Sequence, residues 1–412
     1  MNTYKNRFLL AHTAVTLSVE WSVKMATRQG GSRHLIYFID GTWLWAGSDK
    51  RLDVYSNVWR MNMLLNADDE RGRAQIVHYS RGLGAVDDKV QSYIAGGFAF
   101  GIDEMIADLY VNICSNYQRG DKIYIFGFSR GAVVARALTG LLSYGILEAH
   151  YIDMFAHVWA AYTKQSGEIV LPGAGLTSLG GPNGKPLDYA PHCSQRHPRI
   201  EFVGVFDTVV GGAGLAERFQ EIRLGSCRVP ANVKHAVQLL AIDESRKFFR
   251  PILWTGISNA REKGFDWQPS TLEQIWMPGV HSDVGGAYRG RPLGNLALQT
   301  MIDRVIARTS LSFDLKRCRE LQVVTGDAIR IHDELENVWK LLGKEVRDGL
   351  PKPPHLLHPF AKTLVESQVS YKAVKNKGPY PLTKSFSSLP TAKEFRSDVF
   401  RSNCGALPKP RK

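Results

Sequence analysis

Residues 127–131 of this 412-residue chain read Gly-Phe-Ser-Arg-Gly and separate a strand pattern from a helix pattern. Residues 123–126 are β-branched and aromatic, whereas residues 132–142 carry apolar side chains at helical spacing. Gly-x-Ser-x-Gly in this context is typical of a nucleophile elbow, a tight strand-to-helix turn that presents a serine above a sheet. The motif alone also occurs by chance, so the flanking patterns carry the interpretation. They predict an α/β fold with Ser129 as the candidate nucleophile.

Two stretches of backbone are candidates for an oxyanion hole beside this serine. The N–H of Arg130 begins the helix that follows Ser129 and points to where an oxyanion would form. Residues 34–39 form an apolar strand that enters Asp-Gly-Thr-Trp, and hydrolases with such an elbow take a second donor from a loop after a neighbouring strand. Gly41 and Thr42 are therefore candidates for that donor. An ordinary Asp-Gly turn explains the same residues.

A carboxylate and a histidine follow two later strand patterns. Residues 200–206 predict a strand that ends at Asp207, and residues 273–277 predict a last strand before the loop that carries His281. A serine hydroxyl is a weak nucleophile until an imidazole takes its proton, and the imidazole needs a carboxylate to fix its tautomer. Ligand-facing groups of open α/β sheets collect beyond the carboxyl ends of the strands. Ser129, Asp207 and His281 are thus expected to form a triad.

Two other acidic residues lie near the predicted triad in the sequence pattern. Asp243 is the main rival acid, but it follows residues 231–242, which have a helical pattern, and its neighbours Glu244 and Arg246 indicate an ion-pair cluster. Asp283 lies beside His281, and one carboxylate is too few for a metal site.

Three glycine-rich or long loops need their own interpretation. Residues 81–84 and 95–101 match neither a phosphate-binding nor a dinucleotide-binding motif, so no cofactor and no metal are expected. Residues 163–198 are rich in Gly, Pro and Ser, and we expect a long flexible loop that covers the site.

The chain divides into three regions by pattern. Residues 1–33 read as an N-terminal extension, faintly like a signal peptide but broken by polar residues, and Met25 is an alternative start to Met1. Residues 34–310 hold the α/β pattern, and residues 311–412 are expected to be helical and basic. The five cysteines are far apart, which favours neither a zinc site nor a disulfide framework. A helix in the segment 52–65, a strand in 75–79 and a helix in 102–114 complete the expected start of the sheet.

The formal charge of +13 is concentrated near the end of the sequence. Residues 361–412 hold eight Lys and three Arg against two Glu and one Asp. Such a segment is compatible with a solvated end, with a surface for anionic lipid or a partner, or with nucleic acid. No nucleic-acid-binding motif accompanies it, so nucleic acid is not expected. No uncharged apolar run reaches the length of a membrane span.

Four motifs together resemble a known family. They are residues 38–43 (Phe-Ile-Asp-Gly-Thr-Trp), 127–132 (Gly-Phe-Ser-Arg-Gly-Ala), 203–209 (Val-Gly-Val-Phe-Asp-Thr-Val) and 278–286 (Pro-Gly-Val-His-Ser-Asp-Val-Gly-Gly). The set resembles the α/β-hydrolase-like family that includes type VI secretion phospholipase effectors, over roughly residues 34–300. The resemblance implies a mostly parallel sheet flanked by helices and hydrolysis of glycerophospholipid acyl esters without a cofactor. It carries the roles of nucleophile, acid and base onto Ser129, Asp207 and His281.

Three functions are compatible with these sequence features. The first is a phospholipase A-type acyl hydrolase, the second a hydrolase of a soluble ester or thioester, and the third a catalytically idle hydrolase fold that binds a partner. Ester hydrolysis is favoured because all three chemical groups of a triad are present. We expect a cytoplasmic protein in the producing cell, with lipid as substrate and peripheral contact with anionic membrane through the basic region; delivery to another cell is compatible with the family.

Overall fold

The computed structural model describes most of the chain from residue 32 onward. The described residues are 32–41, 55–82, 101–210, 227–259, 270–289, 291–321, 330–333, 343–348, 355–365, 368–371, 376–380, 382–393, 396 and 400. Most of the predicted N-terminal extension, Thr42, the glycine-rich residues 95–100 and the last twelve residues lie outside them.

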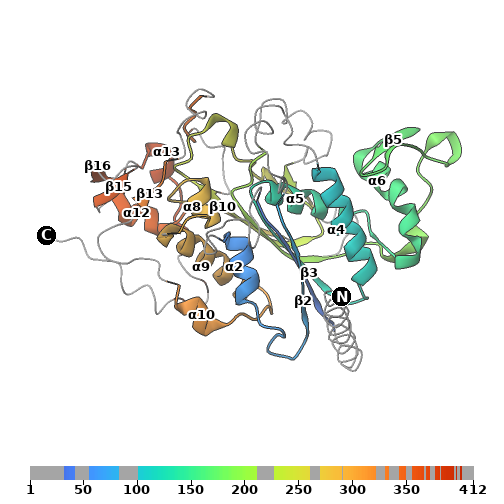
Figure 1. Ribbon diagram of the computed structural model, residues 1–412, viewed down its shortest axis with the longest axis horizontal. Coiled ribbons are helices and arrows are strands. Elements are labelled where there is room, and N and C mark those ends of the chain that lie inside the picture. The colour runs from blue at the N-terminus through green and yellow to red at the C-terminus, as the bar shows by residue number, and fades with distance from the viewer. Residues whose placement is uncertain are drawn as a thin grey trace, which may run out of the picture.

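A seven-stranded sheet forms the centre of the molecule, and every pairing within it is parallel (Figure 1). In spatial order its strands are β14 (His355–Leu357), β12 (Thr271–Met277), β10 (Val233–Ala241), β8 (Ile200–Phe206), β3 (Lys122–Phe128), β1 (His34–Ile39) and β2 (Gln75–Ser80). Because the strands are parallel, their carboxyl ends lie along one edge of the sheet. This arrangement confirms the α/β-hydrolase-like fold class predicted from the sequence.

Helices cover both faces of the sheet. On one face α4 (Ile102–Asn116), α5 (Arg130–Leu142) and α6 (Phe155–Thr163) pack on a core that includes Ile123 and Ile125. On the other face α2 (Asn57–Leu64) and α9 (Pro292–Ile306) pack on a core that includes Tyr124 and Phe126. Successive residues of β3 thus point into different cores, which explains why the strand is apolar throughout.

The smaller elements connect and extend these layers. They are β4 (Ile146–Leu147), η2 (Ala149–Met154), β5 (Glu168–Leu171), β6 (Gly175–Ser178), η3 (Pro182–Gly184), η4 (Ala190–His192), β7 (Cys193–Gln195), β9 (Arg228–Val229), η6 (Lys247–Phe249), β11 (Gly256–Ile257), α8 (His281–Gly285), α10 (Leu315–Arg319), β13 (Arg330–Ile331), α12 (Pro359–Val365), β15 (Gln368–Tyr371), β16 (Asn376–Pro379) and α13 (Lys384–Ser387). Within the segment 52–65 that the sequence predicts to be helical, α2 begins at Asn57, and the side chain of Ser56 caps it by accepting a hydrogen bond from the N–H of Trp59.

The helix predicted over residues 231–242 is wrong, because this segment is strand β10 near the middle of the sheet. The run is apolar enough to be buried on both faces, and a short buried strand cannot be told from a buried helix by periodicity alone. The correction places Asp243 just beyond the carboxyl end of a strand, rather than at a helix end.

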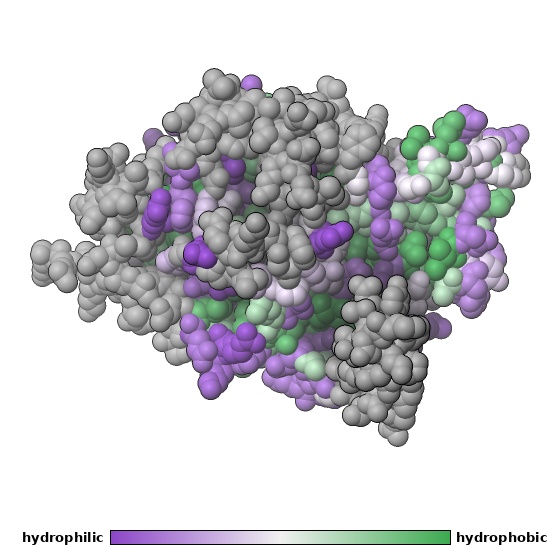
Figure 2. Space-filling model, in the orientation of Figure 1, coloured by the Kyte–Doolittle hydropathy of each residue, from purple (hydrophilic) through white to green (hydrophobic). Residues whose placement is uncertain are grey.

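The flexible cover predicted over residues 163–198 is also wrong. The segment contains an antiparallel β5–β6 hairpin, and β7 pairs with β4, the strand that follows α5. It therefore packs at the end of α5 that is remote from Ser129. Val170 and Leu176 pair across the hairpin and are 63% and 67% exposed. Figure 2 shows apolar side chains gathered on the surface of this lobe.

The region after residue 310 completes the sheet and one of its cores. Strand β14 pairs with β12, so β12 is not the last strand, as the sequence pattern predicted. Phe313, Phe360 and Phe386 are buried in the core that also holds α9. The region contains strands as well as helices and shares its packing with residues 34–310. None of the described helices combines the length and apolar composition that a membrane span requires.

Candidate active site

The turn at Ser129 has the geometry of a nucleophile elbow. Ser129 has φ of 57° and ψ of −122°, a strained conformation for a residue with a side chain, and it directly precedes α5. A Cβ on Gly127 would lie 2.5 Å from the carbonyl oxygen of Gly131, and a Cβ on Gly131 would overlap the carbonyl oxygens of Ile39 and Asp40. Both glycines are therefore required for β1, β3 and α5 to meet this closely.

The predicted oxyanion donors differ in what they contact. Arg130 is the first residue of α5 and is buried. A Cβ on Gly41 would lie 3.3 Å from the Cβ of Ser129, so the loop after β1 does border the elbow. The N–H of Gly41, however, donates to Oδ1 of Asp40 at 2.7 Å. Thr42 lies outside the described residues.

Asp40 is a buried carboxylate that the sequence interpretation did not use. Its Oδ2 accepts hydrogen bonds from the hydroxyls of Ser56 at 2.7 Å and Tyr79 at 2.8 Å. Burial raises the pKa of Asp40 to about 6, and these hydrogen bonds oppose the rise. The carboxylate holds the start of the loop after β1 against α2 and β2.

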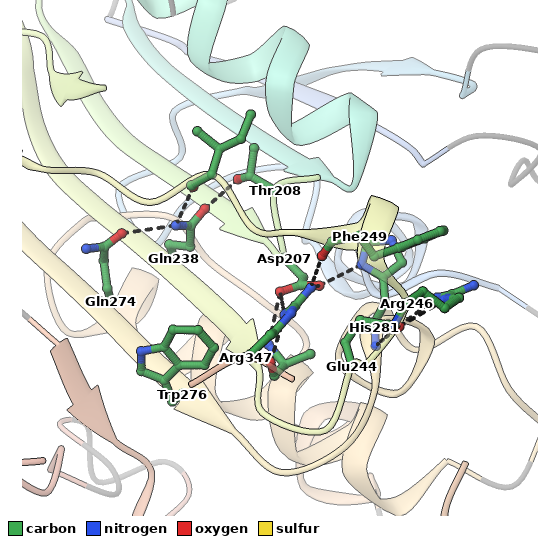
Figure 3. A network of polar contacts seen from close by, with 12 residues as sticks. Asp207, Thr208, Gln238, Glu244, Arg246, Phe249, Gln274, Trp276, His281 and Arg347 are labelled. Atoms are coloured by element: carbon green, nitrogen blue, oxygen red, sulfur yellow. Dashed lines mark hydrogen bonds and ion pairs between the residues drawn. The ribbon is translucent and has the colours of Figure 1, made fainter. Parts of the chain in front are cut away.

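Asp207 and His281 are in direct contact, as Figure 3 shows. Asp207 follows β8, is fully buried, and its Oδ2 lies 2.7 Å from Nδ1 of His281. The sequence pattern placed His281 on a loop, but it is the first residue of the short helix α8. Ser129 is adjacent through the sheet, since its N–H donates to the carbonyl of Phe206 at 3.0 Å. Within the described residues, no hydrogen bond joins Ser129 to His281.

Arg347 is a further partner of Asp207 that sequence reasoning missed. Its Nη1 lies 2.7 Å from Oδ1 and its Nη2 lies 2.9 Å from Oδ2 of the carboxylate. Burial alone would raise the pKa of Asp207, but Arg347 and His281 together hold that pKa well below its usual range. The acid is thus ionised throughout the physiological range.

His281 lies between two aromatic rings. Phe128, the residue before the nucleophile candidate, stacks on the imidazole at 4.7 Å between ring centroids, and Phe249 meets it edge-on at 5.1 Å. The N–H of His281 donates to Oε2 of Glu244 at 3.3 Å, and Glu244 in turn pairs with Arg246. Burial lowers the pKa of His281, although the contact with Asp207 opposes this. A neutral imidazole of this kind can accept a proton.

Two buried amides, which the strand patterns gave no reason to expect, bond to the backbone of the segment that follows Phe249. Gln238 on β10 donates to the carbonyl of Ile252 at 3.1 Å, and Gln274 on β12 exchanges hydrogen bonds with the backbone of Trp254 at 2.8 and 2.9 Å. Figure 3 shows the two amides side by side. They fix Ile252 and Trp254 against strands β10 and β12.

Asp243, the rival acid, contacts other groups. Its Oδ2 accepts hydrogen bonds from the N–H of Gly279 at 2.6 Å and the hydroxyl of Tyr380 at 2.8 Å. Removal from water raises its pKa to about 6. The carboxylate that is hydrogen-bonded to the His281 ring is instead that of Asp207.

Asp283 pairs with His332, whose Nδ1 lies 2.7 Å from Oδ1 of the carboxylate. It also accepts a hydrogen bond from the N–H of Val280 and thereby caps α8. Among the described residues, no group of three or more His, Cys, Asp or Glu side chains is placed to hold a metal ion.

Comparisons with known proteins add a family context to this geometry. The family model described as "T6SS, Phospholipase effector Tle1-like, catalytic domain" matches residues 33–304. The uncharacterized protein YEL023C of Saccharomyces cerevisiae is 27% identical over 253 residues, which is 57% of this chain and 34% of the yeast protein. The chain thus spans about a third of that relative. A crystal structure of an uncharacterized protein from Pseudomonas aeruginosa aligns with a TM-score of 0.40 and 19% identity, over 79% of this chain and 52% of the other.

Proposed function

The chain belongs to the family of Tle1-like phospholipase effectors of type VI secretion, and on this premise we propose that it is a serine ester hydrolase whose nucleophile is Ser129. The substrate class that we propose is glycerophospholipid, with cleavage of an acyl ester of the phospholipase A type. The observation that carries the proposal is the hydrogen bond between Asp207 and His281 beside a strained serine turn.

The proposed reaction uses these groups in two steps. Oγ of Ser129 attacks the acyl carbonyl while Nε2 of His281 takes the hydroxyl proton, and Asp207 stabilises the resulting imidazolium. The N–H of Arg130 donates to the oxyanion of the tetrahedral intermediate. His281 then protonates the departing glycerol oxygen, which leaves a lysophospholipid and an acyl-serine. Water, deprotonated by His281, releases the fatty acid and restores Ser129.

The Ser129–His281 hydrogen bond is expected to form when substrate binds. Hydrogen bonds of this kind are often long or misaligned in a free enzyme and tighten in the complex with substrate. The strained backbone of Ser129 leaves its side chain free of a helix-capping role, since it makes no capping hydrogen bond to α5.

Turnover of wild type and Ser129→Ala on three substrates tests the proposal. These are vesicles of a diacyl phospholipid, a short soluble ester and an acyl thioester, with fatty acid and lysophospholipid measured as products. We expect wild type to release both products from phospholipid and Ser129→Ala to lose about 10⁶ in turnover while staying folded. Hydrolysis of only the soluble ester or thioester would replace the substrate class, and hydrolysis by neither protein would leave a binding fold.

We further propose that the basic C-terminal region assists on anionic membranes. The substitutions Lys409→Gln, Arg411→Gln and Lys412→Gln together should weaken binding to anionic vesicles at low salt, by about 1 kcal/mol per charge near the surface. Hydrolysis of a soluble ester should be unchanged. Equal vesicle binding by both proteins at low and high salt would remove this cluster from the mechanism.

A further inference from the structure

We propose that Arg347 is a positioning residue of this active site: its guanidinium fixes the Asp207 carboxylate in the one orientation that presents Oδ2 to His281. The inference rests on the function proposed above. Arg347 lies beyond residues 33–304, the part that the family model matches. The region after the matched domain would therefore supply part of the machinery.

The contacts around Asp207 leave the carboxylate a single arrangement. Oδ1 accepts from the N–H of Ala241 at 3.0 Å and from Nη1 of Arg347 at 2.7 Å. Oδ2 accepts from Nη2 of Arg347 at 2.9 Å and lies 2.7 Å from Nδ1 of His281. Both carboxylate oxygens thus have two partners each. A planar fork that meets both oxygens at once sets the plane of the carboxylate, which a single-point donor cannot do.

Arg347 also ties together the elements on which the acid and base sit. Nη1 donates to the carbonyl of Ala241 at 2.7 Å, at the end of β10, and Nη2 donates to the carbonyl of Phe249 at 2.6 Å. Phe249 is the residue whose ring lies edge-on to His281. One buried side chain therefore joins β8, β10 and the segment that covers the imidazole.

The backbone that carries Arg347 is attached beside the same site. The N–H of Glu345 donates to the carbonyl of Ser245 at 2.9 Å, and the N–H of Lys247 donates to the carbonyl of Gly343 at 3.2 Å. These bonds attach residues 343–348 to the loop that follows β10. That loop also holds Glu244, which accepts the backbone N–H of His281.

The charge of Arg347 has a measurable consequence for proton transfer. The charged groups that act on His281 are Asp207 on one side and Glu244 with Arg246 on another. Asp283 lies two residues further along α8, and Asp243 bonds to the N–H of Gly279, two residues before His281. Arg347 contacts Asp207, the carboxylate that shares a proton with the imidazole. Without its positive charge, the His281–Asp207 pair should bind a proton more tightly. The acid limb of the pH profile of kcat/KM should therefore move to higher pH.

Four variants measured on a soluble ester test this role. Arg347→Met removes the charge and the fork, Arg347→Lys keeps the charge alone, and Arg347→Ala opens space for added guanidinium. A pocket of about 100 Å³ borders Arg347 and gives the ion a route to the site. Arg250→Met is the matched control, because Arg250 lines the same pocket but is exposed.

We expect Arg347→Met to lose about 10²-fold in kcat, as for a misplaced catalytic group, and to shift the acid limb upward by about one pH unit. Arg347→Lys should lose activity, but the acid limb of its pH profile should stay close to that of wild type. Guanidinium should restore Arg347→Ala but not Ser129→Ala, and Arg250→Met should resemble wild type. Thermal unfolding reports the folded fraction of each variant.

A purely structural arginine would give another pattern. Activity would then fall only with the folded fraction, the acid limb of Arg347→Lys and Arg347→Met would coincide with that of wild type, and guanidinium would have no effect; this result overturns the proposal. Activity retained by Ser129→Ala would instead reject the proposed function, whatever the arginine variants show.

Discussion

Asp207 and Asp243 follow neighbouring parallel strands, β8 and β10, yet their pKa values are shifted in opposite directions. Arg347 and His281 keep the pKa of Asp207 well below its usual range in spite of its complete burial. Burial raises the pKa of Asp243 to about 6, because the groups that donate to it among the described residues, Gly279 and Tyr380, are neutral and the charge of Arg347 opposes the rise only weakly. At the same edge of one sheet, direct hydrogen bonds from a cation therefore distinguish the carboxylate that can serve as the charged member of a triad.

Replacing each acid in turn should affect activity very differently. Asp207→Asn should lower kcat/KM by about 10⁴, because the amide holds the wrong tautomer of His281 and does not stabilise the imidazolium. Asp243→Asn should stay close to wild type, since the amide oxygen can still accept from Gly279 and Tyr380. Steady-state rates on a soluble ester, corrected for the folded fraction, provide the measurement. The reverse ranking would move the acid role to Asp243.

The two acids should also differ in how the free energy of unfolding depends on pH. The folded-state pKa of Asp243 is raised, so its contribution is fully present below the unfolded value near 4 and is lost as the pH rises through about 6. Asp243→Asn removes that loss and should gain about 3 kcal/mol over wild type at pH 7, and little at pH 4.

Asp207 should show the opposite trend, because its lowered pKa contributes stability above pH 4 that is lost on acidification. Urea unfolding of wild type and both variants at pH 4 and pH 7 separates the two acids. An equal effect of Asp243→Asn at the two pH values would contradict the assignment of a raised pKa.

The nucleophile elbow is easier to predict from the sequence than the acid–base pair. The elbow is a local feature: Gly127, Ser129 and Gly131 lie within five residues, and strand, turn and helix follow directly from their pattern. The family resemblance and the fold class are confirmed by the family match and by the parallel sheet. The catalytic roles of Ser129, Asp207 and His281 stay predictions, although the structure brings the last two into contact.

The acid–base half depends on contacts between residues far apart in the chain. Strand β10 was mistaken for a helix because an apolar run in the middle of a sheet has no helical or alternating signature of its own. Arg347 stands 140 positions from Asp207, and nothing in its local sequence distinguishes it from a surface arginine. Its place depends on long-range contacts: residues 343–348 bond to the loop after β10, and β14 then pairs with β12.

The most direct test of the account is to identify the residue that an active-site-directed fluorophosphonate labels. Such a probe reacts with a serine only where a base has activated the hydroxyl, so peptide mapping by mass spectrometry reads the nucleophile itself. The account predicts a single adduct on Ser129, absent in Ser129→Ala, slower in Asp207→Asn and unchanged in Asp243→Asn. An adduct on another serine, or none on wild type under conditions where it hydrolyses ester, would contradict it.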